Sequence, residues 1–108
     1  KANATVTIAH SRTKDLAAEC READILVAAV GKAKLITADM VKDGVVVIDA
    51  GCGIEDGKIY TEVESKVSKK ASLLTPKTGC IGPLTIAMFL KNVMNLFRLS
   101  RIPVLFLL

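Results

Sequence analysis

Four consecutive polar residues, His10, Ser11, Arg12 and Thr13, follow a segment at positions 4–9 in which threonines alternate with apolar residues. That alternation is typical of a β-strand with one face more buried than the other. Where a strand ends beside the adenine ribose of a dinucleotide, an acidic residue selects NAD, whereas an arginine accommodates the 2′-phosphate of NADP. The four residues include no carboxylate, so they favour NADP. An equally weighted interpretation is that they only end a strand and cap a helix.

A glycine pair, Gly51 and Gly53, follows the apolar run at residues 45–49. A dinucleotide-binding fingerprint would need a helix directly after the pair and a glycine or alanine at position 56. Position 56 is Asp, and residues 55–58 are typical of a turn. The pair is therefore interpreted as a loop whose backbone closely approaches a ligand or a neighbouring strand.

Other kinds of site have little support. His10 is the only histidine, and no cysteine or carboxylate lies near it in the sequence, so no metal site is predicted. The cysteines Cys20, Cys52 and Cys80 form no CxxC pair, which is typical of a reducing cytoplasm. Aromatic residues make up 4% of the chain, which argues against a nucleic-acid partner. No run approaches the roughly 18 apolar residues of a membrane helix.

Alternating strands and helices would position these residues. A continuous apolar run predicts a strand at residues 25–30 that is buried on both faces of a parallel sheet. Further strands are predicted at residues 45–49 and 72–75. The alternation predicts an α/β fold, with a Rossmann-like parallel sheet and flanking helices.

Four helices are expected around these strands. Thr13 is predicted to cap the first helix, with Asp15 in its first turn and Leu16, Cys20 and Ala23 on one face. The others are predicted at residues 37–42, 62–70 and 84–99. Pro83 is expected at the first position of the last helix, whose mostly apolar surface predicts burial. Residues 100–108 form an apolar tail to which no function is assigned.

Taken in order, several segments resemble the methylenetetrahydrofolate dehydrogenase/cyclohydrolase family. The segments that carry the resemblance are residues 4–13, 23–32, 39–44, 46–49, 55–58, 75–76 and 82–88. The resemblance implies that residues 1–99 are part of an NAD(P)-binding Rossmann-like domain. The family uses NADP, or less often NAD, to oxidise methylenetetrahydrofolate, and usually hydrolyses the product to formyltetrahydrofolate.

The resemblance also implies roles for individual residues. Ser11 and Arg12, with His10 and Thr13 beside them, are expected to face the 2′-phosphate of NADP. The other residues implied to contact the cofactor are Val30, Gly31, Gly51, Cys52 and Thr85. The residues implied to border the cleft where folate meets the cofactor are Gly79, Gly82 and Pro83.

The family's glycine-arginine-serine phosphate loop and its YxxxK motif have no counterpart here and would precede residue 1. The start of the chain without a methionine likewise indicates missing upstream sequence. We therefore expect no catalytic residue on this chain and a sheet that lacks its N-terminal strand. The intact enzyme is expected to be a cytoplasmic homodimer that acts on a tetrahydrofolate derivative, without a nucleic-acid or membrane partner.

Some ligand-facing positions depart from the family pattern. The family's Pro-Gly-Gly-Val-Gly-Pro-Met-Thr appears within residues 77–85 without its proline and with Cys80 in place of a glycine. The family's usual Gly-Asp is Thr61-Glu62 here. These departures leave two alternatives open: a degenerate, non-catalytic nucleotide-binding or interaction module, and a structural remnant that binds no ligand.

Overall fold

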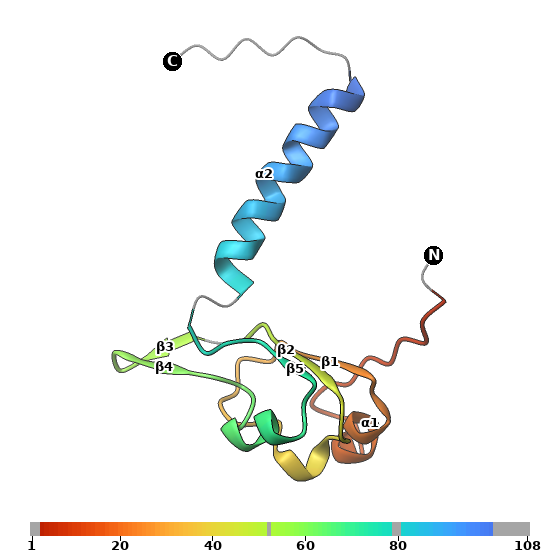
Figure 1. The fold of residues 1–108 in the computed structure, drawn as a ribbon. Coiled ribbons are helices and arrows are strands. Elements are labelled where there is room, and N and C mark those ends of the chain that lie inside the picture. Colours follow the sequence, from red (N-terminus) through yellow and green to blue (C-terminus); the bar gives the residue numbers. More distant parts are fainter. Residues whose placement is uncertain (1–2, 52, 79–80, 101–108) are drawn as a thin grey trace.

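Figure 1 shows the protein as a computed structural model that describes residues 3–51, 53–78 and 81–100. In chain order the elements are α1 (Leu16–Glu22), β1 (Ile25–Ala28), the 3₁₀ helix η1 (Ala38–Met40), β2 (Val46–Asp49), β3 (Gly53–Glu55), β4 (Lys58–Tyr60), the 3₁₀ helix η2 (Ser65–Lys69), β5 (Leu73–Leu74) and α2 (Ile81–Ser100). The mixture of helices and strands confirms the predicted α/β class.

Three short strands form a parallel sheet in the order β1-β2-β5. Ile25 pairs with Val46, which pairs on its other side with Leu73. Because parallel strands cannot be joined by tight turns, the chain must leave the sheet and return between them. The parallel sheet predicted from the apolar runs is therefore confirmed, with β2 at its centre and β5 as the brief strand expected at residues 72–75.

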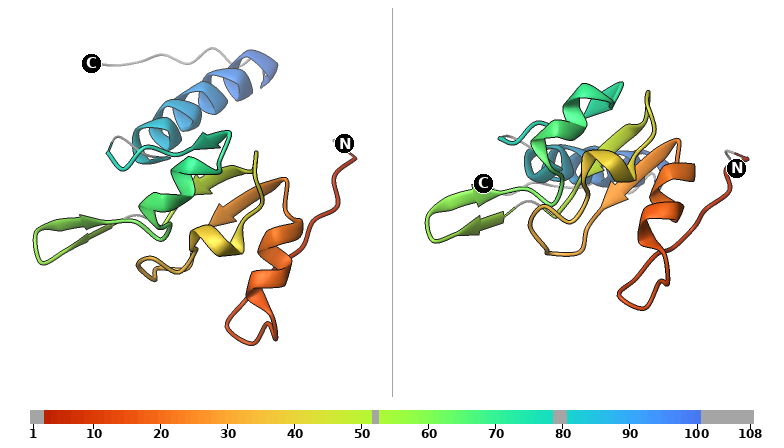
Figure 2. Two further views of the ribbon diagram at one scale, coloured as in Figure 1. Left: turned by 60° about the horizontal axis from the view of Figure 1, so that its bottom comes forward. Right: turned by 90° about the horizontal axis from the view of Figure 1, so that it is seen from below.

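One face of the sheet carries the hydrophobic core, and α1, η1 and η2 lie along that face (Figure 2). Leu26 and Val47 of the strands pack in one cluster with Cys20 of α1 and Val67 of η2. Val47 and Val67 are fully buried, and each such burial contributes about 1.5 kcal/mol or more. Burial also raises the pKa of the Cys20 thiol, and the charge of Glu19 adds to the effect.

The opposite face of the sheet is open in the described part of the chain. Ile25, Val27 and Leu73 are 63%, 60% and 63% exposed, respectively. Successive side chains of a strand point to opposite faces, so only alternate residues of β1 reach the core. The prediction that residues 25–30 are buried on both faces is therefore wrong for this structure. The strand also ends earlier, at Ala28.

Residues 4–9 form no strand, contrary to the prediction. They run away from the sheet towards the N-terminus (Figure 1), and Val6 and Ile8 are 80% and 84% exposed. The alternating pattern suits a half-buried surface, but a strand also needs a neighbour to share its backbone hydrogen bonds. None of the described strands pairs with this segment.

The helix α1 has the buried face that was predicted but a different cap. Cys20 is buried, and the other residues of that face pack against the core beside it. The N-cap is Asp15, whose Oδ1 accepts a hydrogen bond of 2.9 Å from the N–H of Ala18. Asp15 directly precedes the first helical residue, where a side-chain oxygen reaches an unpaired N–H. Thr13, the predicted cap, belongs to the preceding turn.

The second and third predicted helices are each reduced to a short 3₁₀ helix. After η1, Val41 returns to an extended conformation and enters the core. Before η2, Val63 forms a parallel bridge with Ile36, and both side chains are buried. Burial of these three apolar side chains therefore outweighs the local tendency of the two segments to form longer helices.

The antiparallel hairpin of β3 and β4 was not predicted, although the turn at residues 55–58 was. Asp56 and Gly57 have φ of 50° and 72°, as a two-residue turn of type I′ requires. Ile54 and Ile59 pair across the hairpin. An Asp-Gly pair flanked by apolar residues is the sequence signal that could have identified it.

The helix α2 is longer and more exposed than predicted. It begins at Ile81, so Pro83 lies in its first turn, where N–H groups have no helical partner to lose. Leu84, Phe89 and Leu96 are 60%, 66% and 67% exposed, and α2 stands clear of the sheet (Figure 1). The expectation of a mostly buried helix is therefore wrong here. Residues 101–108 of the predicted tail lie outside the described residues.

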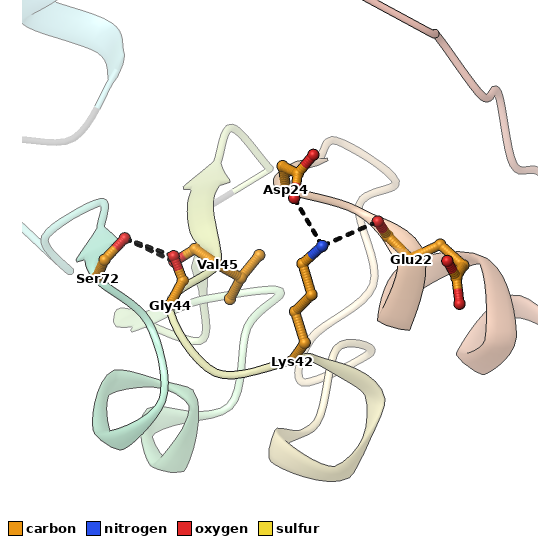
Figure 3. A network of polar contacts seen from close by, with 6 residues as sticks. All are labelled: Glu22, Asp24, Lys42, Gly44, Val45 and Ser72. Carbon is orange, nitrogen blue, oxygen red and sulfur yellow. Dashed lines mark hydrogen bonds and ion pairs between the residues drawn. The ribbon is translucent and has the colours of Figure 1, made fainter.

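A polar network joins the amino-terminal ends of the strands (Figure 3). Lys42 Nζ lies 2.6 Å from Asp24 Oδ1 and donates to the carbonyl oxygen of Glu22 at 3.2 Å. Ser72 Oγ donates to the carbonyl oxygen of Gly44 at 2.7 Å. The hydrogen bond from Lys42, with its positive charge, holds the pKa of Asp24 below its usual range. These contacts align the strands at the edge opposite their carboxyl ends.

Candidate functional site

Ligands of open α/β sheets bind outside the carboxyl ends of the strands. Two carboxylates are buried at this edge: Asp49, the last residue of β2, is 3% exposed, and Glu62 is fully buried. They are the only buried charged residues among those whose side chains the structure describes. Because a buried carboxylate needs hydrogen bonds or a cation, the partners of these two groups define the shape of the edge.

Glu62 binds the loop that follows β1. The N–H of Val30 donates to Oε1 at 2.7 Å and to Oε2 at 2.9 Å, and the N–H of Gly31 also donates to Oε1. From the loop after β2, Gly51 lies against the same carboxylate: a Cβ atom there would be 1.8 Å from Oε1 and 2.1 Å from Cδ. One side chain therefore contacts the loops at the ends of two neighbouring strands.

Asp49 joins the loop after β2 to the end of β5 and to the segment that carries Glu62. Its Oδ1 accepts a hydrogen bond from the N–H of Gly51 at 3.3 Å, and its Oδ2 accepts one from the N–H of Val63 at 3.2 Å. Its own N–H donates to Thr75 Oγ1 at 3.1 Å. Thr75 follows β5, so Asp49 and Glu62 together connect the ends of all three strands.

The segment that carries Glu62 is held in place by residues 34–36. The N–H of Lys34 donates to the carbonyl oxygen of Thr61 at 2.9 Å, and the N–H of Ile36 donates to that of Glu62 at 3.0 Å. The N–H of Glu64 returns a hydrogen bond of 2.8 Å to the carbonyl oxygen of Ile36. These hydrogen bonds fix the backbone of Glu62, and its side chain extends from there to the carboxyl edge of the sheet.

The residues predicted to face a phosphate form a separate turn ahead of α1. The N–H of His10 donates to Thr13 Oγ1 at 2.9 Å, and the N–H of Thr13 donates to the carbonyl oxygen of His10 at 2.9 Å. The N–H of Arg12 donates to His10 Nδ1 at 3.1 Å. Ser11 and Arg12 are exposed, so the turn presents a hydroxyl and a guanidinium group to solvent.

The remaining predicted site residues lie on or before α2. Thr85 Oγ1 donates to the carbonyl oxygen of Ile81 at 2.8 Å, a bond within the helix, and Gly82 and Pro83 are exposed in the first turn. Cys52 and Gly79 lie outside the described residues. Among the described residues, no hydrogen bond joins these positions on α2 to the carboxyl edge of the sheet or to the turn before α1.

The structure therefore brings together three of the predicted residues, Val30, Gly31 and Gly51. Asp49 and Glu62, which hold them there, were not predicted from the sequence. In the sequence, Asp49 is only the polar last residue of a predicted apolar strand. Glu62 is only the first residue of a predicted polar helix. The one available signal is that Glu62 stands where the resembled family usually has aspartate. No group of three or more His, Cys, Asp and Glu side chains in the described ranges could hold a metal ion.

Comparison with known proteins identifies the family. The sequence model of the family described as tetrahydrofolate dehydrogenase/cyclohydrolase, NAD(P)-binding domain, matches residues 1–101. The bifunctional protein FolD of Moorella thermoacetica is 55% identical over 98 residues, which cover 89% of this chain and 35% of that protein. The bifunctional protein FolD of Nautilia profundicola is 58% identical over 94 residues, which cover 85% of this chain and 33% of that protein.

Solved structures share the fold. The bifunctional enzyme FolD, a methylenetetrahydrofolate dehydrogenase/cyclohydrolase from Campylobacter jejuni, matches with a TM-score of 0.77 and 48% identity, over 82% of this chain and 32% of that chain. The methylenetetrahydrofolate dehydrogenase-cyclohydrolase of Trypanosoma brucei, solved with NADP cofactor and an inhibitor, matches with a TM-score of 0.78 and 34% identity, over 93% of this chain and 37% of that chain. The predicted Rossmann-like fold is confirmed.

The chain spans about a third of the length of the curated relatives it matches, 35% of one and 33% of another. The family match extends from the N-terminal segment through the sheet and α2. It confirms the resemblance found in the sequence. The chain belongs to the tetrahydrofolate dehydrogenase/cyclohydrolase family and corresponds to its NAD(P)-binding domain.

Proposed function

We propose that this chain is the cofactor-binding part of an NADP-dependent methylenetetrahydrofolate dehydrogenase/cyclohydrolase in folate one-carbon metabolism. The observation that carries the proposal is the match of residues 1–101 to an NAD(P)-binding domain. The carboxyl edge of the parallel sheet supports it, because dinucleotides bind at such edges. When bound, NADP takes up a hydride from the substrate, and the role of this chain is to hold the cofactor in position.

The turn at residues 10–13 suits the 2′-phosphate of NADP. Arg12 is exposed and forms no ion pair with a described carboxylate, so its guanidinium group is free to donate hydrogen bonds to a phosphate. Ser11 offers a hydroxyl beside it. No acidic residue lies in the turn to repel an anion. The Trypanosoma brucei relative is described with NADP, which supports the same choice of cofactor.

The remaining assignments follow from the family. In this proposal the cofactor also contacts Val30, Gly31, Gly51, Cys52 and Thr85. The loop bordering the substrate cleft comprises Gly79, Gly82 and Pro83. No residue of this chain has a catalytic role. Residues 1–99 form the domain, and residues 100–108 form a tail.

The intact enzyme is a cytoplasmic homodimer that acts on a tetrahydrofolate derivative, without a nucleic-acid or membrane partner. None of the described helices combines the length and the apolar character needed to span a membrane.

Titration of the 108-residue chain with NADP in a calorimeter tests cofactor binding. We expect saturable binding of NADP that is tighter than binding of NAD. Adenosine triphosphate serves as a control for general phosphate affinity and should bind more weakly than NADP. Absence of binding at millimolar NADP would overturn the proposed function of the chain.

A non-catalytic nucleotide-binding module is the second candidate, favoured by the departures from the family pattern in the loop before α2. A chimera that joins this chain to the preceding part of the Moorella thermoacetica relative distinguishes the two. NADP-dependent oxidation of methylenetetrahydrofolate by the chimera would establish that the chain supports catalysis. A folded chimera that binds NADP without turnover, beside an active intact relative, would favour the non-catalytic module.

A further inference from the structure

We propose that Glu62 is a positioning residue at the carboxyl edge of the sheet. Its carboxylate occupies the backbone N–H groups that follow β1, so this strand end contacts the ligand without donating hydrogen bonds to the ligand's phosphates. The inference deepens the proposed function and rests on it for the identity of the ligand. The fully buried carboxylate of Glu62 contacts Val30, Gly31 and Gly51.

The carboxylate of Glu62 has no cationic partner in the described residues, where the ion pairs are Lys42–Asp24 and Lys66–Glu64. Burial of an ionised carboxylate is costly unless hydrogen bonds replace its hydration. Here the backbone N–H groups of Val30 and Gly31 supply them. The carboxylate and the loop after β1 therefore depend on each other.

The same hydrogen bonds decide what this strand end can recognise. Backbone N–H groups that converge in a loop form a common binding site for phosphate. The N–H groups of Val30 and Gly31 are already occupied by Glu62, and a phosphate placed there would meet a negative charge. The phosphates of the ligand must then be held elsewhere, and this edge contacts an uncharged or cationic part of it.

Gly51 shows that the carboxylate also shapes the loop after β2. Its φ lies outside the left-handed region, so its backbone conformation alone does not demand glycine. The demand comes from space, because a Cβ atom would lie 1.8 Å from Glu62 Oε1. An added Cβ atom would therefore displace the carboxylate of Glu62 from its place beside Val30 and Gly31.

Experiments on the ligand-free chain test directly whether Glu62 holds the loop after β1. Glu62→Gln replaces one acceptor oxygen by a donor facing N–H groups, so the Val30 and Gly31 amides should exchange hydrogen about tenfold faster or more. Glu64→Gln, two residues along the same segment, is the matched control and should leave both exchange rates unchanged. Unaltered exchange in folded Glu62→Gln would overturn the proposal.

A double-mutant cycle provides a second, independent measurement. Gly51→Ala should lower the thermal midpoint strongly beside Glu62 but much less beside Glu62→Asp, since the shorter side chain withdraws from the added methyl group. Equal losses in the two backgrounds would contradict the packing of Gly51 on Glu62. Neither measurement requires that the chain bind NADP.

Binding measurements then test whether Glu62 affects the affinity of the chain for the cofactor. Glu62→Gln is expected to weaken NADP and NAD by the same factor, about tenfold, because the displaced loops lie away from the 2′-phosphate. Inorganic phosphate should leave the Val30 and Gly31 amide resonances of the wild-type chain unmoved. Movement of those resonances, or unchanged cofactor affinity in folded Glu62→Gln, would refute the proposal for Glu62. Failure of the wild-type chain to bind NADP would refute the proposed function instead.

Discussion

Arg12 is the residue on which the preference for NADP should depend. Arg12→Ala is expected to weaken NADP binding about tenfold or more, because a charge-assisted contact with the 2′-phosphate is lost. NAD lacks that phosphate, so its affinity should change by less than about twofold. Calorimetric titration of both cofactors against the variant measures the ratio of the two affinities.

Lys69→Ala is the matched control for that substitution. Lys69 is exposed on η2, and its replacement removes the same unit of positive charge from the chain. The ratio of NADP to NAD affinity should stay at the wild-type value. A proportional loss of both cofactors in Arg12→Ala would contradict the role assigned to Arg12.

Composition predicts exposed polar residues better than buried ones. The turn that contains Ser11 and Arg12 is polar and exposed, as its residue types suggest. The burial of Glu62 depends on contacts with Val30 and Gly31, about thirty positions earlier in the chain. No local pattern encodes a contact of that range, so this part of the site could only be found in the fold.

Asp15 stabilises the N-terminus of α1 as its cap. Asp15→Ala should lower the free energy of unfolding by about 1 kcal/mol, because the N–H of Ala18 loses its acceptor. Urea denaturation followed by circular dichroism measures the change. Thr13→Ala is the comparison, and it should cost less because Thr13 does not cap the helix. A larger loss in Thr13→Ala would restore the cap expected from the sequence.

The ion pair of Asp24 with Lys42 makes stability depend on pH at the acid end. The hydrogen bond from Lys42 lowers the pKa of Asp24 in the folded chain. A carboxyl group with a lowered folded-state pKa stabilises the fold above its unfolded pKa, and that contribution is lost as the pH falls through the lowered value. The thermal midpoint of the wild type should therefore fall more steeply than that of Asp24→Asn between about pH 5 and pH 2.

Asp43→Asn provides the control for this pH dependence. Asp43 is exposed one residue from Lys42, and no described cation pairs with it. Its variant should follow the wild-type curve. If Asp24→Asn and the wild type lose stability in parallel on acidification, the pair does not act as the structure suggests.

Elements were predictable where local sequence and tertiary contacts agree. The apolar runs that form β1 and β2 pair with each other within the chain, so both strands were found. Residues 4–9 have an equally good strand pattern but no described partner. Residues 37–42 have a helical pattern that ends early because Val41 is drawn into the core. Local propensity favours a helix or strand, but the element forms only where strand pairing or burial of side chains also stabilises it.

Among the described residues, the hydrophobic core lies on one face of the sheet, and the other face is apolar and open. The isolated chain should therefore bind a dye that fluoresces on apolar surfaces. Val27→Thr should reduce that fluorescence because Val27 is 60% exposed on the open face. Val6→Thr is the control, since Val6 is 80% exposed on a segment outside the sheet. Equal fluorescence in wild type and Val27→Thr would show that the dye binds elsewhere.

The position of β2 between its two parallel neighbours has a consequence for the order of folding. Neither β1 nor β5 can pair until a long intervening segment has closed, and such closures slow folding. The hairpin of β3 and β4 needs only its own two-residue turn and can form within microseconds. During synthesis, β1 must wait until β2 has emerged, and β2 gains its second neighbour only when β5 follows. Mature sheet contacts should therefore appear last in a refolding experiment, well after the hairpin that projects beside them.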